Sequence, residues 1–367
     1  MPRLFGVQSV LSTDMWPYWF LFMAPAYLAV TRLNRTPQMS SLVQRKQWSS
    51  EWQWIFVLLV LMIGWRHEVG GDWAIYLEQI ESLANGSSST SLQLQDPAFA
   101  LANWFAAQSG LGVYFVNLLS AVFFSWGVLV FCRAQPRPWL ALVVAVPYLI
   151  TVVAMGYTRQ GVAIGVAMLA MVALGQGNTL RFMFWIALAA VFHKSAVILV
   201  PLAILASSRR RFFTLLWVAV AGFALFALLL QESVDFLIYG YVQSQYQSAG
   251  AEIRIAMNAL PAAIFLIFRK RFQLSSEQRS FWIWMAWSAL LFVPLLIVSP
   301  SSTAVDRVAL YWIPIQLFVL SRLPNALGQS QGKNAVWVYA VVAYSAAVHF
   351  VWLVYADTAF AWLPYQF

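Results

Sequence analysis

The sequence predicts an all-α protein, a polytopic transmembrane helical bundle, and three observations lead to this prediction. Of its 367 residues 62% are hydrophobic and 10% are charged, whereas a soluble domain carries about 25% charged residues. Apolar stretches of roughly 17–25 residues recur along the chain, with short basic clusters between them. A helix satisfies its own backbone hydrogen bonds inside a bilayer, so each apolar stretch predicts a helix.

Taken in order, the apolar stretches predict about 12 spans. They lie near residues 15–31, 52–65, 112–132, 138–155, 160–175, 181–193, 195–207, 212–230, 255–268, 281–298, 308–320 and 335–355. The two short stretches within 181–207 predict either a tilted pair or a re-entrant hairpin. The outer loop 66–111 predicts surface helices, one of which begins at Pro97 with Asp96 as its N-cap. Residues 1–367 therefore form a single membrane domain.

Lysine and arginine predict the orientation of this bundle. With the N-terminus outside, the inward loops hold 16 of the 22 basic residues, as the positive-inside rule requires. These are Arg32, Arg35, Arg45, Lys46, Arg133, Arg137, Arg181, Arg209, Arg210, Arg211, Arg269, Lys270, Arg271, Arg279, Arg322 and Lys333. The rule also explains the net charge of +9 without a nucleic acid partner. The outward remainder is Arg3, Arg66, Arg159, Lys194, Arg254 and Arg307. An outward cation opposes the orientation signal, so each of these predicts another role.

The first outward cluster is the segment RHEVGGDWAIY. Arg66, Glu68 and Asp72 lie within seven residues, around a Gly-Gly pair that allows a tight or left-handed backbone. Asp72 is placed to cap the helix that carries Tyr76. The alternative is an ordinary interfacial turn in which the arginine snorkels.

Two further polar groups interrupt apolar stretches on the same side. Arg159 and Gln160 form one of them, and the planar fork of a guanidinium suits bidentate binding of phosphate. The alternative is a structural ion pair with an outward carboxylate. His193 and Lys194 form the other, and histidine is the commonest general acid or base. A histidine in an apolar span is otherwise a satisfied core residue.

The last outward groups are Arg254 and the segment DRVALYW. Arg307 and Tyr311 are separated by one helical turn and share a face, while Asp306 can simply pair with Arg307. Together the outward cations suit a pyrophosphate anchored in lipid. The sequence has no Asp-x-Asp motif, nucleotide-binding loop or zinc spacing, so we expect arginines to stabilise the leaving phosphate, with no metal and no cofactor.

These segments resemble the EpsG-like family of exopolysaccharide and O-antigen (Wzy-type) polymerases. RHEVGGDWAIY is similar to that family's Arg-x-x-x-Gly-Thr-Asp-Tyr-x-x-Tyr element. TRQGVAIG, FHKSAVILVP, EIRIAMNALP and DRVALYWIPIQLFVLS resemble its later blocks, in the same order. The resemblance covers residues 52–325. Gly71 and Trp73 depart from the usual Thr and Tyr, which affects the expected local backbone and sugar specificity.

The resemblance implies a membrane glycosyltransferase that joins undecaprenyl-pyrophosphate-linked oligosaccharide repeat units at the periplasmic face of the bacterial inner membrane. It implies a lipid-linked glycan donor and acceptor, surrounding membrane lipids, a chain-length-regulating co-polymerase and a flippase as partners. The site residues that carry over by motif position are Arg66, Asp72, Tyr76, Arg159, Gln160, His193, Lys194, Arg254 and Arg307.

In the expected mechanism Arg159 and Arg254 hold the donor pyrophosphate. His193, or one of the carboxylates Asp72 and Glu68, removes the proton from the acceptor hydroxyl. Aromatic residues at the outer rim are expected to stack on sugar rings, namely Trp65, Trp73, Tyr76, Trp104 and Tyr311. Two other functions remain open at this point, a lipid-linked glycan flippase or transporter and an O-antigen ligase.

Overall fold

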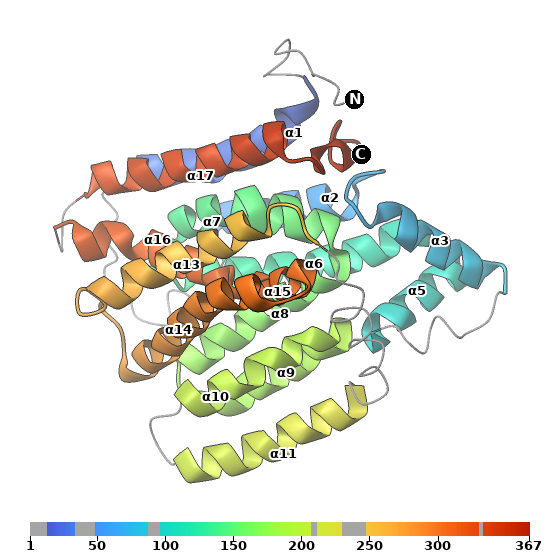
Figure 1. The fold of residues 1–367 in the computed structure, drawn as a ribbon. Coiled ribbons are helices and arrows are strands. Elements are labelled where there is room, and N and C mark those ends of the chain that lie inside the picture. Colours follow the sequence, from blue (N-terminus) through green and yellow to red (C-terminus); the bar gives the residue numbers. More distant parts are fainter. Residues whose placement is uncertain (1–12, 34–47, 87–95, 207–210, 230–246, 330–332) are drawn as a thin grey trace.

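The computed structural model describes residues 13–33, 48–86, 96–206, 211–229, 247–329 and 333–367. Within these ranges every regular element is a helix, which confirms the predicted all-α class. The long helices lie side by side and form a bundle (Figure 1). Six basic residues used in the orientation argument lie outside the described residues, namely Arg3, Arg35, Arg45, Lys46, Arg209 and Arg210.

The first half of the chain forms α1 (Trp16–Thr31), α2 (Ser50–Gly64), α3 (Trp73–Ala84), α5 (Pro97–Ser109), α6 (Gly112–Arg133), α7 (Pro138–Ala145), the π-helix η2 (Val146–Ala154), α8 (Thr158–Gly175) and α9 (Thr179–Phe192). The second half forms η3 (Lys194–Leu199), α10 (Val200–Ala206), α11 (Arg211–Leu229), α13 (Ala251–Phe268), α14 (Ser276–Val298), α15 (Ser302–Ala309), η6 (Leu310–Trp312), α16 (Pro314–Leu327), α17 (Ala335–Tyr355) and η7 (Ala359–Ala361).

Five of the described helices are long and apolar enough to cross a membrane, namely α6, α8, α13, α14 and α17. A sixth span results if residues 302–312 and α16, which meet at an angle of 45°, are counted together. The prediction of about 12 spans is not confirmed. Crossing a bilayer takes about 20 helical residues, and several predicted spans form shorter helices, such as α2 with 15 residues and α9 with 14.

The short predicted pair at 181–207 does form helices, and the break between them positions the site. Helix α9 ends at Phe192, and His193 is extended, with φ −155° and ψ 113°. The 3-10 helix η3 and then α10 follow. The extended residue frees the side chain of His193 and the backbone N–H of Lys194 to bind outside their own helices.

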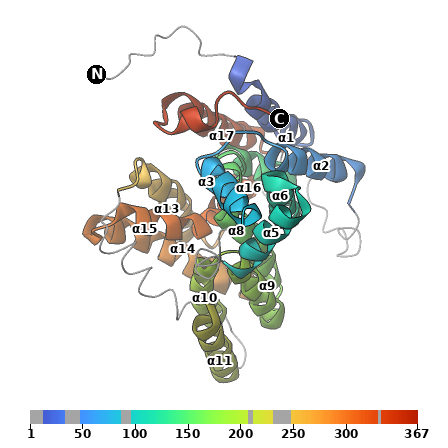
Figure 2. The same cartoon turned by 90° about the vertical axis from the view of Figure 1, so that its right-hand side faces the viewer.

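Helix α8 lies near the centre of the bundle, where 83% of its span is buried, against 28% for α17 (Figure 2). Its close approach to α6 depends on two glycines. A Cβ atom on Gly127 would overlap the carbonyl oxygen of Gly165, and one on Gly165 would overlap the backbone of Phe124. Small residues that let two helices approach closely are typical of packing between membrane helices.

The two ends of the bundle differ in charge. Helices α3 and α5, which are the predicted surface helices, project from one end, and the connection between α13 and α14 lies at the other (Figure 1). We call these the α3–α5 end and the basic end. The described inward residues of the orientation argument lie at the basic end, on or next to its connections: Arg32, Arg133, Arg137, Arg181, Arg211, Arg269, Lys270, Arg271, Arg279, Arg322 and Lys333.

The last residues of the chain support the turn that precedes α3. The N–H of Gly70 donates to the carbonyl of Ala361 at 2.7 Å, and the N–H of His67 donates to the carbonyl of Gln366 at 3.0 Å. Gly70 has φ +106°, and a Cβ there would overlap the carbonyl oxygen of Met155. Only glycine fits this backbone, so the left-handed conformation predicted for the Gly-Gly pair is confirmed at Gly70.

Candidate functional site

Segments that are far apart in the sequence enclose a cavity of about 270 Å³ at the α3–α5 end. Its lining consists of Asp72, Tyr76, Tyr157, Arg159, Gln160, His193, Thr303 and Arg307. Six of these residues were predicted from the sequence as site residues, and the structure brings all six together. Tyr157 and Thr303 were not predicted.

His193 is held by Asp96, the residue at the start of α5. The Nδ1 atom of His193 lies 2.9 Å from Oδ2 of Asp96, and the backbone N–H of Lys194 donates to Oδ1 at 2.9 Å. Asp96 occupies the predicted N-cap position and Pro97 follows it in the first turn, but the carboxylate makes no capping hydrogen bond. Its oxygens bind the break between α9 and η3 instead.

Burial by itself would raise the pKa of the Asp96 carboxyl, but its hydrogen-bond partners and the nearby Arg159 guanidinium hold that pKa below its usual value. The carboxylate is therefore ionised at neutral pH and can only accept hydrogen bonds. It follows that Nδ1 of His193 carries a hydrogen, so the neutral form of the ring has its lone pair on Nε2. This arrangement suits a general base.

Two arginines provide the positive charge of the cavity. The Nη1 atom of Arg159 lies 3.7 Å from Oδ2 of Asp96, and its side chain is 32% exposed. The Cζ atom of Arg307 lies 3.9 Å from the centre of the Tyr157 ring, in cation–π contact. Gln160 fixes the backbone of this second arginine, because its Nε2 donates to the Arg307 carbonyl at 2.5 Å.

Asp72 and Tyr76 form a pair at the start of α3. Asp72 occupies the predicted cap position without a capping hydrogen bond, and its Oδ2 accepts from the Tyr76 hydroxyl at 3.1 Å. Burial raises the pKa of Tyr76, and the Asp72 charge adds to this effect, so the phenol keeps its proton. The pair therefore presents one carboxylate and a neutral hydroxyl to the cavity.

Arg66 is only 1% exposed and does not belong to the cavity lining. Its guanidinium donates to the carbonyls of Val69 and Ile63, and to the side chains of Asn117 and Thr158. Burial lowers its pKa to about 10. These bonds join the turn before α3 to α6 and to the first residue of α8, which stands next to Arg159.

Glu68 also lies outside the lining. It is one of two described non-glycine residues with positive φ, at 52°, and its side chain is 66% exposed. Its carboxylate lies 3.9 Å from the Nε2 atom of His67. This carboxylate is therefore in contact with solvent.

Arg254 is engaged by Asp306, which the sequence analysis paired with Arg307. Its Nε and Nη2 atoms lie 2.7 Å from the two carboxylate oxygens of Asp306. Nη1 donates to the Ala249 carbonyl, and Nη2 also donates to the Ser248 hydroxyl. Asp306 is 5% exposed, so this is a buried bidentate pair that holds α13 against α15. Arg254 is not part of the cavity lining.

Lys194 and Tyr311 are not among the residues that line the cavity. Lys194 contributes its backbone N–H to Asp96. Tyr311 is fully buried, and its hydroxyl lies 3.0 Å from Oγ of Ser195. This contact joins η3, which follows His193, to η6, which follows Arg307.

The aromatic residues expected at the rim separate into two groups. Tyr76 lines the cavity, and Tyr157 joins it. Trp65 and Trp104 are about half exposed, at 51% and 49%, and Trp73 is buried. These three tryptophans and Tyr311 are not among the lining residues. The described ranges contain no group of three or more histidine, cysteine, aspartate or glutamate side chains able to hold a metal ion.

Asp96 is the residue that the sequence analysis placed correctly and assigned the wrong contact. The signal available was the Asp-Pro pair at a helix start, which predicts a cap. The contact with His193 spans 97 residues and depends on how α5 packs against α9. Only two indications of this contact were present in the sequence. His193 interrupts an apolar stretch, and Asp96 is a carboxylate that the orientation argument places on the same side of the membrane.

Comparison with known proteins gives one match. The family model described as the EpsG family matches residues 52–367. This range extends past the resemblance seen in the sequence, to include α17 and the segment that supports the turn at Gly70. No curated protein and no solved structure matches the chain. Because the family model covers most of the chain, the protein belongs to the EpsG family.

Proposed function

We propose that the chain is a membrane glycosyltransferase that joins undecaprenyl-pyrophosphate-linked oligosaccharide repeat units into exopolysaccharide or O-antigen. Membership of the EpsG family supports a polysaccharide polymerase. The observation that carries the proposal is the single cavity shared by His193, which Asp96 orients, and the guanidiniums of Arg159 and Arg307. A base beside two cations is the combination needed to transfer a sugar from a pyrophosphate.

The two arginines bind the donor pyrophosphate in this proposal. Both guanidiniums line the cavity, and Arg307 has no hydrogen bond from its guanidinium to any residue that the structure describes. Fixed positive groups stabilise the negative charge that develops as the pyrophosphate leaves. Arg307 therefore takes the role that the sequence analysis gave to Arg254, whose fork is bound to Asp306.

His193 acts on the acceptor. Its Nε2 removes the proton of an acceptor sugar hydroxyl, whose oxygen forms the new bond to the anomeric carbon. The bond from that carbon to the pyrophosphate oxygen breaks, and the lipid pyrophosphate departs with the electron pair. The Asp96 carboxylate stabilises the imidazolium that results. Asp72 already accepts the Tyr76 hydroxyl and is the alternative base.

The remaining predicted residues support these groups. Arg66 fixes the start of α8 beside Arg159, and Tyr311 joins the walls that carry His193 and Arg307. Lys194 holds Asp96 through its backbone. Tyr76 and Tyr157 provide the aromatic surface in the cavity for a sugar ring.

The proposed orientation places the cavity at the periplasmic face of the bacterial inner membrane. It is supported by the basic end, which lies opposite the α3–α5 end, because loops rich in lysine and arginine stay in the cytoplasm. A reporter active only in the periplasm should be active when fused after residue 367 and silent when inserted near residue 210. The reverse pattern would contradict this orientation.

The function is tested with purified protein in nanodiscs and lipid-linked repeat units. We expect a ladder of longer glycans without added nucleotide, because the pyrophosphate bond of the donor drives the reaction. The ladder should persist with EDTA, because arginines provide the positive charge. His193→Ala should lower the rate about 10²–10⁴-fold, the usual contribution of a general base.

Four results would change the conclusion. Translocation of the lipid with unchanged glycan length would indicate a flippase, and transfer only to a lipid A core would indicate a ligase. A ladder that disappears with EDTA and returns with magnesium would keep the polymerase and reject metal independence. Full activity in His193→Ala would transfer the role of base to Asp72.

A further inference from the structure

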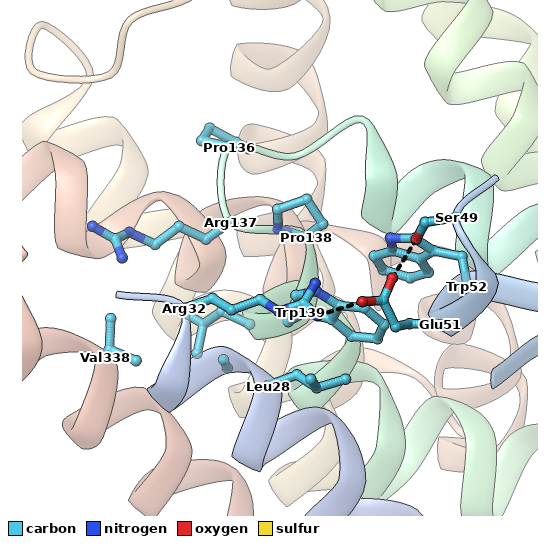
Figure 3. Close-up of a pocket in the computed structure, with 12 residues that line it drawn as sticks. Leu28, Arg32, Ser49, Glu51, Trp52, Pro136, Arg137, Pro138, Trp139 and Val338 are labelled. Atoms are coloured by element: carbon cyan, nitrogen blue, oxygen red, sulfur yellow. Dashed lines mark hydrogen bonds and ion pairs between the residues drawn. The ribbon is translucent and has the colours of Figure 1, made fainter. Parts of the chain in front are cut away.

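A second cavity of about 270 Å³ lies at the basic end, opposite the candidate site (Figure 3). Its walls come from the ends of α1 and α2, from the turn between α6 and α7, and from α17. The lining residues are Leu28, Ala29, Arg32, Ser49, Glu51, Trp52, Pro136, Arg137, Pro138, Trp139, Leu140 and Val338. None of them belongs to the cavity at the α3–α5 end.

Aromatic stacking gives this cavity a rigid wall. The rings of Trp52 and Trp139 are stacked, with centroids 4.0 Å apart and planes 10° apart. The Cζ atom of Arg32 lies 5.6 Å from the centre of the Trp139 ring. The arginine is therefore held beside the tryptophan by a cation–π contact.

The acidic residue of the cavity is fully engaged. Oε1 of Glu51 accepts from Nη2 of Arg32 at 2.6 Å, and Oε2 accepts from the Ser49 hydroxyl at 2.6 Å (Figure 3). Both carboxylate oxygens are therefore occupied by protein donors. The Glu51 carboxylate orients the guanidinium of Arg32 but binds only its Nη2 atom.

The two arginines keep unused donors. Among the described residues, Nε and Nη1 of Arg32 make no hydrogen bond. Arg137 donates from Nε to Asn325 at 2.9 Å and from Nη2 to the Lys333 carbonyl at 3.3 Å, which leaves Nη1. Burial disfavours the charged form of Arg137 and lowers its pKa. A bound anion would stabilise that positive charge.

Among the residues that the structure describes, the lining carries one positive charge in excess, because it contains two arginines and one glutamate. A phosphodiester carries one negative charge and has oxygens that a guanidinium binds well. Apart from Ser49, the rest of the lining is mainly apolar, in particular Leu28, Leu140 and Val338. A ligand that fits both parts has a monoanionic phosphodiester joined to hydrocarbon.

We propose that this cavity binds the headgroup of an anionic glycerophospholipid from the leaflet at the basic end. The phosphodiester lies between Arg32 and Arg137, and the acyl chains leave over the apolar side of the lining. Basic pockets between membrane helices on the cytoplasmic side are known to select such headgroups. This site is independent of the proposed reaction, because it lies at the other end of the bundle.

The proposal is tested by native mass spectrometry of the full chain with phosphatidylglycerol or phosphatidylethanolamine. We expect retention of phosphatidylglycerol. Arg32→Gln removes the excess charge and should weaken retention about fivefold, the usual effect of one basic residue near anionic lipid. Glu51→Gln keeps one oxygen that can accept from Arg32, and its amide NH2 can donate to the Ser49 hydroxyl, but it adds one net positive charge, so it should strengthen retention. Arg181→Gln removes an exposed arginine at the same end and should leave retention unchanged.

Three outcomes would overturn the proposal. The first is equal retention of phosphatidylglycerol by wild type and Arg32→Gln, both with native thermal stability. The second is equal retention of the two lipids by wild type, since the zwitterionic lipid lacks the net charge. The third is displacement of the lipid by equimolar glycerophosphoglycerol, the headgroup without chains, which would identify a site for free phosphodiesters. If Arg32→Gln proves unstable, Glu51→Gln decides the question, because it should strengthen the retention of phosphatidylglycerol, and unchanged or weaker retention would contradict the proposal.

Discussion

Two regions at the α3–α5 end contain arginine and aspartate and use them in opposite ways. Between α13 and α15, Asp306 accepts two hydrogen bonds of 2.7 Å from Arg254. In the candidate site, the carboxylate oxygens of Asp96 accept from His193 and from the backbone N–H of Lys194. The Nη1 atom of Arg159 lies 3.7 Å from Oδ2 of Asp96. The first region joins helices, whereas the second leaves a guanidinium able to bind a ligand.

The difference shows that a cation opposing the orientation signal is not sufficient to identify a binding residue. Arg254 and Arg307 are both outward arginines, yet one is saturated by a buried carboxylate and the other stacks on Tyr157. Availability of the planar fork is what distinguishes them. The geometry of the nearest carboxylate therefore decides the role of each arginine.

The largest effect that would test this comparison comes from Asp96→Asn. The amide keeps the shape of the side chain but loses the charge that orients and stabilises the His193 ring. We expect glycan elongation to slow about 10²–10⁴-fold, as for loss of the base itself. The measurement is the rate of ladder growth in nanodiscs, with Asp357→Asn as the control, because Asp357 is exposed at the same end. Normal elongation by Asp96→Asn would separate the carboxylate from catalysis.

The next effect distinguishes the two arginines directly. Arg307→Ala removes a charged donor from the cavity and should lower the elongation rate about 10–100-fold with unchanged thermal stability. Arg254→Met should instead destabilise the protein by about 3–5 kcal/mol, because it leaves the Asp306 carboxylate buried without its partner.

The double variant Arg254→Met with Asp306→Leu sharpens this distinction. Replacing a buried ion pair by apolar residues of similar size is often neutral, so we expect stability near that of wild type and activity above that of Arg307→Ala. Thermal unfolding and ladder growth provide the two measurements. If the stable double variant is as inactive as Arg307→Ala, the Arg254–Asp306 pair has a role in the reaction as well as in packing.

The smallest effect is the pH dependence of stability that Asp96 contributes. Its pKa is lower in the folded protein than in the unfolded chain. Its contribution is therefore complete above the ordinary aspartate value, about 3.9, and is lost as the pH falls through the folded value. The difference in unfolding temperature between wild type and Asp96→Asn should shrink on acidification below about pH 4. A difference that grows under acid conditions would contradict this assignment.

The sequence was sufficient to predict which residues gather at one end, and the physical reason is the membrane. Charged and polar groups that interrupt apolar helices and oppose the orientation rule are expected at the same end, and the packing of the helices then brings Arg159, His193 and Arg307 to one cavity. The all-α class follows from the same apolar stretches. The EpsG family match confirms the resemblance read from the motifs.

The side-chain pairing could not be predicted. Asp306 lies next to Arg307 in the sequence but points to Arg254, 52 residues away, because α15 packs on α13. The number of spans also depends on local backbone features that an apolar composition does not reveal, such as the extended backbone of His193 and the π-helix η2. An apolar stretch looks the same whether it forms one long helix or two short ones.

The support of the turn before α3 by the last residues of the chain has a consequence for biosynthesis. The N–H of His67 donates to the carbonyl of Gln366. At a translation rate of ~5–20 residues per second, Gln366 is synthesised roughly 15–60 s after His67. The turn that leads to Asp72 therefore remains incomplete while the intervening helices are inserted. Residues 361–366 therefore have to leave the ribosome before the turn that leads to Asp72 takes the backbone described here.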